Sequence, residues 1–279
     1  MNMKKDKIIN IFLALMIFVG LCVMFYPVVS DMWNTYRNNL LISDYKKDVN
    51  DLSKKKADKI WNDAITYNKN HRQNFIKEDV FTNLRKRSKS QYDSYLNISS
   101  NGIMGTIVIP KINVEIPIYH GTGEKELQTG VGHMEGTSLP VGGTSSHCVL
   151  SAHRGLPSAK LFTDLDKMKE GDMFFLHVLD KTLAYKVDAI FTVKPDETQN
   201  LSLVKGKDYV TLLTCTPYGV NTHRLLVRGI RTPYNKTQDQ NVSILKDYRV
   251  WILIATIIVL IIVNAFIIIK NKRKKHSKK

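Results

Sequence analysis

Cysteine is scarce in this sequence, which has three in 279 residues: Cys22, Cys148 and Cys215. Small secreted domains that are held together by disulfides carry cysteine far more densely, so that class of protein is excluded. Histidine pairs at the spacing of helical zinc motifs are also absent. The acids between residues 164 and 170 are expected on a helix surface and do not form a calcium loop. The sequence therefore predicts neither a metal site nor a cofactor.

Charged residues are missing altogether from two long apolar runs, 8–29 and 250–269. About 20 apolar residues suffice to cross a hydrocarbon core of roughly 30 Å as a helix, so both runs are predicted transmembrane helices. Lysine and arginine cluster just outside them, in the short tails 1–7 and 270–279. The positive-inside rule places both tails in the cytoplasm and the segment between the runs on the extracellular side of the cell membrane.

The first apolar run could instead be a signal peptide that is removed after export. Cleavage requires small residues at the exit of the run, and Val28-Val29-Ser30 does not fit that pattern. A retained membrane anchor is therefore the favoured interpretation of residues 8–29.

Acidic residues are outnumbered, with 25 of them against 41 lysines and arginines, and the net charge is +16. A nucleic-acid partner would explain such a balance, but the two tails alone carry nine of these net charges. The remaining basic runs, mainly Lys54–Lys56 and Arg85–Lys89, are most simply solvated helix faces or loops. Nucleic acid is therefore not an expected partner, whereas the basic C-terminal tail is expected to contact anionic lipid head groups.

Glycine and proline are absent between residues 31 and 91. Apolar residues recur in this stretch at helical intervals, as at Leu41, Tyr45, Val49 and Leu52. We therefore predict that residues 30–100 form an N-terminal helical segment, with two or three amphipathic helices that make a stalk or side arm.

The pattern changes after Asn101-Gly102, where short β-type runs begin to alternate with turn residues. The predicted strands are 103–109, 112–119, 147–153, 173–178, 183–193, 209–215 and 224–230, and the predicted helical interludes are 124–128, 159–168 and 199–204. Many short strands with frequent turns favour a barrel or a sandwich. We place this domain at residues 101–233 and predict that residues 234–249 link it to the second apolar run.

Cys215 ends one predicted strand and Arg224 begins the next, with a short loop between them. Antiparallel pairing of these strands would bring the thiol beside a permanent cation, which favours the thiolate or stabilises charge on a carbonyl oxygen. Arginine cannot act as the base, because it keeps its proton in this pH range. His153, at the exit of another predicted strand, is the candidate proton carrier, because histidine titrates near neutral pH.

Other interpretations of these residues remain open on spacing alone. A single cysteine in a β protein is most often a small buried hydrophobe, which is the role expected for Cys148. The other histidines of the outward domain are compatible with ordinary surface or core positions: His120, His133, His147, His177 and His223. The chain could be a cysteine peptidase or a peptidoglycan transpeptidase, neither of which explains Arg224. It could also be a membrane-tethered binding or structural module in which Cys215 and His153 are incidental.

The segment Thr211-Leu-Leu-Thr-Cys215 is similar to the Thr-Leu-x-Thr-Cys signature of sortases, and its continuation to Arg224 resembles class C, the pilin-polymerising group. Upstream motifs also look like that group and occur in the same order: Tyr119-His-Gly-Thr, Gly132-His-Met-Glu-Gly-Thr-Ser-Leu-Pro-Val-Gly-Gly and Ser151-Ala-His153-Arg-Gly-Leu-Pro-Ser-Ala-Lys-Leu-Phe-Thr-Asp-Leu. The resemblance covers residues 102–232, and the two flanking apolar runs match the class C layout.

This resemblance implies a mainly β fold: an eight-stranded sortase-type barrel with short helices, preceded by the helical segment and flanked by two transmembrane helices. By motif match, Cys215, His153 and Arg224 take the catalytic positions. Cys215 would attack the Thr–Gly bond of a Leu-Pro-x-Thr-Gly-like sorting signal, His153 would protonate the leaving amine, and Arg224 would hold the oxyanion or the substrate carbonyl. A lysine amine of the next pilin subunit would then resolve the thioester, which is pilus assembly at a Gram-positive cell surface.

The resemblance leaves the acceptor open. An amine of peptidoglycan is the alternative, as in a sortase that anchors surface proteins to the cell wall. The second apolar run and the class C motifs favour the pilin lysine.

One departure from class C concerns the lid. These sortases commonly carry an Asp-Pro-aromatic lid over the cysteine, and no Asp-Pro pair occurs between Asp31 and Gly102. Tyr92, Asp93 and Tyr95 supply an acid and two aromatic rings for a variant lid. A plain exposed connector is the alternative.

Overall fold

The structure is a computed structural model that describes residues 3–70, 81, 90–237, 239 and 248–276. The chain divides into two compact units, one formed by Met1–Met32 with Ser243–Lys279 and the other by Trp33–Val242. The first unit holds the two apolar runs, and the second holds the helical segment and the β domain.

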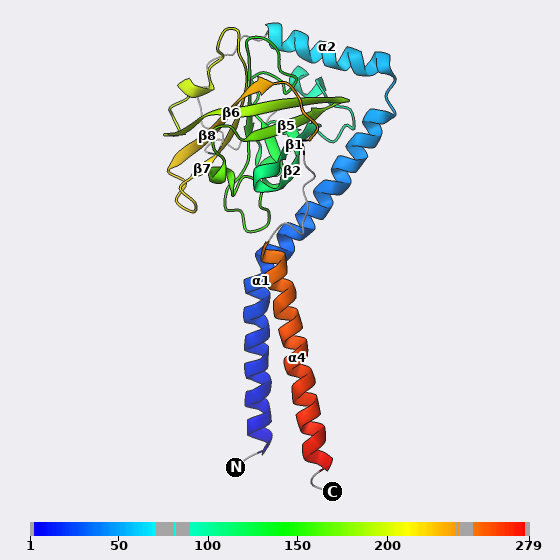
Figure 1. Cartoon of the computed structure of the whole chain (residues 1–279), viewed down its shortest axis with the longest axis vertical. Coiled ribbons are helices and arrows are strands. Elements are labelled where there is room, and N and C mark those ends of the chain that lie inside the picture. Colours follow the sequence, from blue (N-terminus) through cyan, green and yellow to red (C-terminus); the bar gives the residue numbers. More distant parts are fainter. Residues whose placement is uncertain (1–2, 71–80, 82–89, 238, 240–247, 277–279) are drawn as a thin grey trace. The chain divides into compact units, whose positions relative to one another are not determined.

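Two long helices account for the first unit. Helix α1 (Met3–Asn50) begins there and continues into the second unit, and α4 (Tyr248–His276) lies near the C-terminus (Figure 1). By length and composition, the part of α1 that starts at Leu15 could cross a membrane, consistent with an N-terminal anchor. The apolar part of α4 that the structure describes, Val250–Val263, is shorter than the 18 residues that a candidate membrane span needs. The second span therefore stays a prediction. The boundary predicted after residue 29 falls inside α1, which continues past Pro27.

The helical segment of the second unit is packed on the β domain. It consists of the end of α1, then α2 (Lys54–Asn70) and the short 3-10 helix η1 (Gln91–Ser94). The Tyr45 hydroxyl donates a hydrogen bond to Met104 O at 3.2 Å and accepts one from Leu179 N at 3.0 Å. Asn68 of α2 donates to the carbonyls of Leu139 and Gly142. These helices therefore cover part of the barrel core and are not a free stalk.

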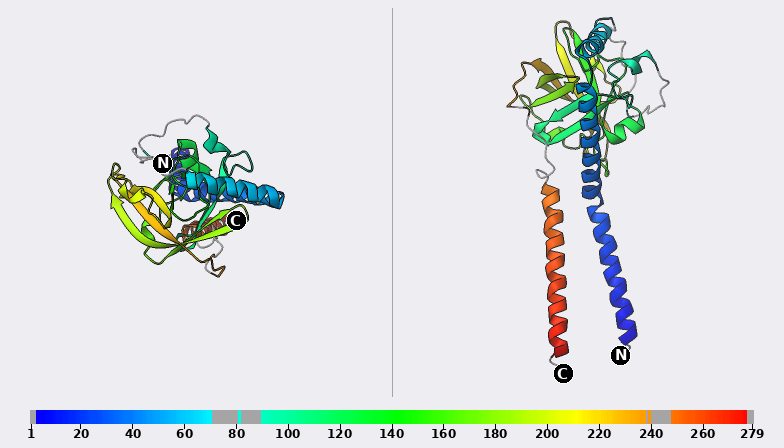
Figure 2. Two further views of the ribbon diagram at one scale, coloured as in Figure 1. Left: turned by 90° about the horizontal axis from the view of Figure 1, so that it is seen from above. Right: turned by 90° about the vertical axis from the view of Figure 1, so that its right-hand side faces the viewer.

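Eight strands form a closed barrel in the order β1-β2-β3-β4-β7-β8-β6-β5. They are β1 (Ile103–Ile109), β2 (Val114–His120), β3 (Val131–His133), β4 (Ser146–Ser151), β5 (Met173–Val178), β6 (Lys181–Val193), β7 (Asp208–Thr216) and β8 (His223–Thr232). The strands, coloured green to orange, gather into one β unit in both views of Figure 2. Neighbouring strands are antiparallel except β2–β3 and β4–β7, which are parallel. The predicted eight-stranded barrel is confirmed.

Short helices fill the connections, and one prediction there is wrong. Helix α3 (Glu124–Thr129) matches its prediction, and η2 (Pro110–Ile112) and η4 (Gln199–Leu201) are single 3-10 turns. The predicted helix 159–168 is instead a series of turns with one 3-10 turn, η3 (Leu165–Lys167). Leu161 has a φ of 40°, outside the helical region, and its side chain is buried. Burying apolar side chains along this whole connection requires an irregular path, because a surface helix can bury only one face.

The start of the predicted linker also packs on the barrel. The Tyr234 ring lies 6.0 Å from the Phe175 ring, and its hydroxyl donates to Asp239 Oδ2 at 3.0 Å. The Asp239 carboxylate lies 3.5 Å from His177 Nε2.

Candidate active site

Cys215 and Arg224 lie directly opposite each other on adjacent strands. Cys215 is the last residue but one of β7, and the antiparallel register pairs it with Arg224 near the start of β8. Paired residues of two antiparallel strands have their side chains on the same face of the sheet. Both are nearly enclosed, with exposed fractions of 7% for Cys215 and 6% for Arg224. The Arg224 Nη1 donates to the carbonyls of Asn221 and His223, which fixes the guanidinium over the β7–β8 turn.

His153 approaches the same place from the other side of β7. Strand β4 runs parallel to β7 and its last pair is Ser151 with Leu213. Continuing this parallel register by two residues along each strand places His153 across from Cys215. Two hydrogen bonds continue the pairing beyond β4: Ala152 N to Leu213 O at 3.1 Å and Thr214 Oγ1 to Ala152 O at 2.7 Å. The structure therefore brings the three predicted residues to one end of the neighbouring strands β4, β7 and β8.

The environment of His153 tunes its proton affinity. Its side chain is half-buried, and this burial lowers the pKa of His153 below its ordinary value of 6.5, while the Glu124 carboxylate acts in the opposite direction. A lowered pKa makes the imidazolium a stronger acid and the neutral imidazole more available at pH 7. Such a group can give a proton to a departing amine and take one from an entering amine.

Phe81 is a site residue that sequence reasoning missed. Its ring lies 5.6 Å from the His153 ring, and the Arg224 Cζ lies over it at 5.3 Å. It also packs against a buried apolar cluster that includes Val149 and Leu213. The one available signal was its place two residues after an acid, in Asp79-Val-Phe81, where valine stands in the position of the expected lid proline.

The three residues offered as a variant lid have other contacts. The Tyr92 hydroxyl is 2.7 Å from His133 Nδ1, and the Tyr92 ring packs edge-on against His120. The Asp93 carboxylate accepts from Ser90 N, which caps the η1 turn, and the Tyr95 ring lies 5.0 Å from the Tyr67 ring. Among the residues that the structure describes, Phe81 lies against His153 and Arg224, and the variant lid stays a prediction.

Cys148 occupies a different environment from Cys215. It lies in the middle of β4, paired with Val210, and its exposed fraction is 2%. Complete burial raises the pKa of the Cys148 thiol well above its usual value, and the Asp208 carboxylate adds to this. A thiol that stays protonated is a poor nucleophile.

Among the residues that the structure describes, no group of three or more His, Cys, Asp or Glu side chains is placed to share a metal ion.

Comparison with known proteins agrees with this geometry. The sequence profile of the sortase domain matches residues 107–232. Sortase C of Streptococcus pneumoniae is 47% identical over 70% of this chain and 97% of its own, with a TM-score of 0.67. Sortase C1 of Streptococcus agalactiae is 51% identical over 70% of this chain and 99% of its own, with a TM-score of 0.63.

Curated relatives give the same family at lower identity. Sortase A of Streptococcus agalactiae is 29% identical over 206 residues, which are 68% of this chain and 83% of that protein. Sortase A of Staphylococcus aureus is 30% identical over 151 residues, which are 53% of this chain and 69% of that protein. Similar structures and similar sequences thus point to the same family. The chain belongs to the sortase family, whose members are cysteine transpeptidases, and its solved neighbours include class C sortases.

Proposed function

We propose that this chain is a membrane-anchored class C sortase that cleaves a Leu-Pro-x-Thr-Gly-like sorting signal and joins it to a lysine amine of a pilin. The observation that carries the proposal is the pairing of Cys215 with Arg224 on β7 and β8. His153 follows the last β4–β7 pair by two residues, as Cys215 does on β7. A thiol beside a permanent cation and a titratable imidazole is the arrangement that thioester chemistry requires.

The first half of the reaction forms the acyl-enzyme. The Cys215 thiolate attacks the threonine carbonyl carbon, and the negative charge that develops on the carbonyl oxygen is stabilised by the Arg224 guanidinium. As the C–N bond to glycine breaks, His153 gives its proton to the departing amine, which leaves as the new N-terminus. The products are a thioester on Cys215 and a neutral His153.

The second half transfers the acyl group. A lysine amine of the acceptor attacks the thioester, neutral His153 removes the proton from that nitrogen, and the thiolate of Cys215 departs. An isopeptide bond has replaced the original peptide bond, and the enzyme returns to its starting state. The solved sortase C of Streptococcus pneumoniae has been described in terms of its pilin substrate specificity, which supports the lysine acceptor for this chain.

A test uses the full chain in detergent with a Leu-Pro-x-Thr-Gly peptide and no acceptor amine, followed by intact mass measurement. We expect a covalent adduct in the wild type and in Cys148→Ala, and none in Cys215→Ala. Adding a pilin-derived lysine peptide should then release a joined product. Failure of the wild type to form an adduct, with Phe81→Ala also inert, would count against sortase activity. Release by a peptidoglycan amine and not by lysine would instead support wall anchoring.

The membrane arrangement is part of the proposal. Runs 8–29 and 250–269 both span the membrane, both tails are cytoplasmic, and the barrel faces outward. Lys205, exposed on the barrel, and Ser277 of the C-terminal tail are suitable positions for single cysteines in a background in which Cys22, Cys148 and Cys215 are all replaced by alanine. In intact cells, a membrane-impermeant maleimide should label Lys205→Cys, and should label Ser277→Cys only after lysis. Labelling of both positions in intact cells would contradict a second span.

A further inference from the structure

The parallel pairing of β4 and β7 stops before it reaches the catalytic pair. The last paired residues are Ser151 and Leu213, whereas His153 and Cys215 lie two positions further on. Beyond one more backbone bond, from Ala152 N to Leu213 O, side chains take over the hydrogen bonding. Thr214 Oγ1 donates to Ala152 O at 2.7 Å on one side of the His153–Cys215 level, and Arg154 Nη1 donates to Thr216 Oγ1 at 3.0 Å on the other.

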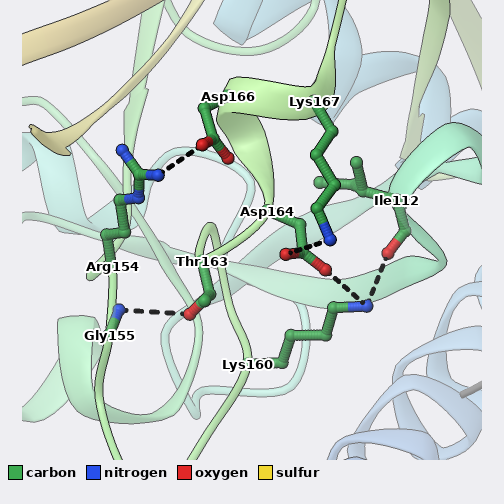
Figure 3. A network of polar contacts seen from close by, with 8 residues as sticks. All are labelled: Ile112, Arg154, Gly155, Lys160, Thr163, Asp164, Asp166 and Lys167. Carbon is green, nitrogen blue, oxygen red and sulfur yellow. Dashed lines mark hydrogen bonds and ion pairs between the residues drawn. The ribbon is translucent and has the colours of Figure 1, made fainter. Parts of the chain in front are cut away.

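Arg154 is held from two directions. Its Nη2 donates to Asp166 Oδ2 at 2.6 Å, in the turn η3, while its Nη1 reaches Thr216. Figure 3 shows the guanidinium beside Asp166, and shows Gly155 N held by Thr163 Oγ1. The Phe162 N donates to His153 O at 3.2 Å. The loop that carries His153 is therefore tied both to β7 and to the turns at 159–168.

Burial of this arginine is not explained by stability. Only 8% of its side chain is exposed, and its Nε has no hydrogen-bond acceptor among the residues that the structure describes. A buried, charged group with an unsatisfied N–H lowers stability relative to an apolar side chain of similar size. A planar fork with several donors can, however, hold two partners in a fixed geometry.

Arg154 does not act on the reacting atoms directly. Thr216 follows Cys215 in an extended strand, so their side chains point to opposite faces of the sheet. The contact of Arg154 with Thr216 thus lies on the face opposite the thiol. Its influence on chemistry must pass through the backbone positions of its neighbours, His153 in the loop and Cys215 in β7.

We propose that Arg154 is a positioning residue: its fork, anchored by Asp166 and bonded to Thr216, holds His153 at the level of Cys215 where the strand ladder has ended. This inference rests on the proposed roles of Cys215 and His153.

The test compares Arg154→Met, Arg154→Lys and Thr216→Val in the full chain in detergent. Lys167→Met is the matched control, because Lys167 lies in the same turns and forms its ion pair with Asp164. Thermal unfolding first establishes that each variant is folded. Two readouts follow: the pH profile of Cys215 alkylation by iodoacetamide, located by peptide mass, and the rate and KM of adduct formation with the Leu-Pro-x-Thr-Gly peptide.

We expect Arg154→Met to slow adduct formation by about tenfold or more with KM nearly unchanged, because misplacing a catalytic group affects turnover. The midpoint of Cys215 alkylation should move to higher pH, because the thiolate loses its imidazolium neighbour. Arg154→Lys should be intermediate, since it keeps the charge but not the fork. Thr216→Val should reproduce the loss, and combining it with Arg154→Met should add little.

Four outcomes would overturn the proposal: a rate within twofold of wild type, a loss confined to KM, losses that multiply in the double variant, or an unmoved alkylation midpoint. If Arg154→Met does not fold, Thr216→Val decides the matter. A wild type that is inert toward the peptide would count against the proposed substrate. The pH profile of Cys215 alkylation would still test the positioning role of Arg154.

Discussion

At the scale of residues, the site combines enclosure with charge. Cys215 and Arg224 are both nearly buried, and the ring of Phe81 lies against His153 and Arg224 from outside the barrel strands. A peptide substrate must therefore displace a covering side chain to reach the thiol of Cys215. Because Phe81 contacts two of the three candidate catalytic residues, it is the side chain whose removal should matter most for access.

Replacing Phe81 by alanine should expose the thiol. We expect iodoacetamide to alkylate Cys215 roughly tenfold faster in Phe81→Ala than in the wild type, since the rate follows the population of the uncovered state. Phe191→Ala is the matched control, because Phe191 packs on the same apolar cluster but over Arg228. Equal rates in wild type and Phe81→Ala would show that Phe81 does not limit access.

Replacing Arg224 by lysine should separate charge from geometry. Lysine keeps a cation opposite Cys215 but loses the planar fork, so we expect adduct formation to slow by about 10²-fold, the scale of losing one oxyanion donor. Arg228→Lys is the control, since Arg228 lies on the same strand but pairs with Asp188 at 2.9 Å. An Arg224→Lys variant as fast as Arg228→Lys would remove Arg224 from the mechanism.

At the scale of elements, the N-terminal helices stabilise the barrel. Tyr45 of α1 is 2% exposed, and its hydroxyl connects Met104 of β1 to Leu179 after β5. Burial raises the pKa of Tyr45 to about 12, so this hydroxyl keeps its proton at every physiological pH. One side chain thus satisfies two buried backbone groups that lie far apart in sequence.

Tyr45→Phe should destabilise the second unit without altering its shape. Both backbone groups lose a partner inside the protein, and we expect the free energy of unfolding to fall by about 2 kcal/mol. Chemical denaturation measures this change, with Tyr218→Phe as a control because Tyr218 is exposed. A loss no greater than that of the control would mean that water reaches the two backbone groups.

The elements differ in how well the sequence predicts them. Turn residues predict most strand positions, and the short β7–β8 connection makes the pairing of Cys215 with Arg224 a local inference. Its chemistry and its place at a strand exit made His153 a candidate, but its position beside Cys215 depends on parallel pairing of strands more than 60 residues apart. The spacing of residues could not show that pairing, and the sortase resemblance implied it. Phe81 was missed because its contacts are tertiary. The helix predicted at 159–168 was wrong because that connection is buried on more than one side.

At the scale of the whole molecule, acid stability depends on a buried imidazole. His147 of β4 lies 2.7 Å from Thr211 Oγ1 and 2.9 Å from Ser202 O, and burial lowers its pKa from 6.5 to about 4. The unfolded chain therefore binds a proton near pH 6.5 that the folded chain does not bind until about pH 4. Stability contributed by neutral His147 is fully present above pH 6.5 and declines as the pH falls through this window.

This linkage predicts a loss of about 3 kcal/mol in the free energy of unfolding between pH 7 and pH 4 from His147 alone. Urea denaturation at a series of pH values measures it. In His147→Gln the curve should be flatter over the same range, even if the variant is less stable at pH 7. An unchanged slope in His147→Gln would assign the acid sensitivity to other groups.

The parallel direction of β4 and β7 also determines when the enzyme becomes competent. Two parallel neighbours cannot be joined by a tight turn, so the chain makes β5 and β6 before it returns to lay β7 beside β4. The histidine and the cysteine consequently meet only after most of the barrel has been built. Under the proposed mechanism, a nascent or truncated chain would therefore carry an ordinary thiol, and reactivity would arrive together with the completed fold.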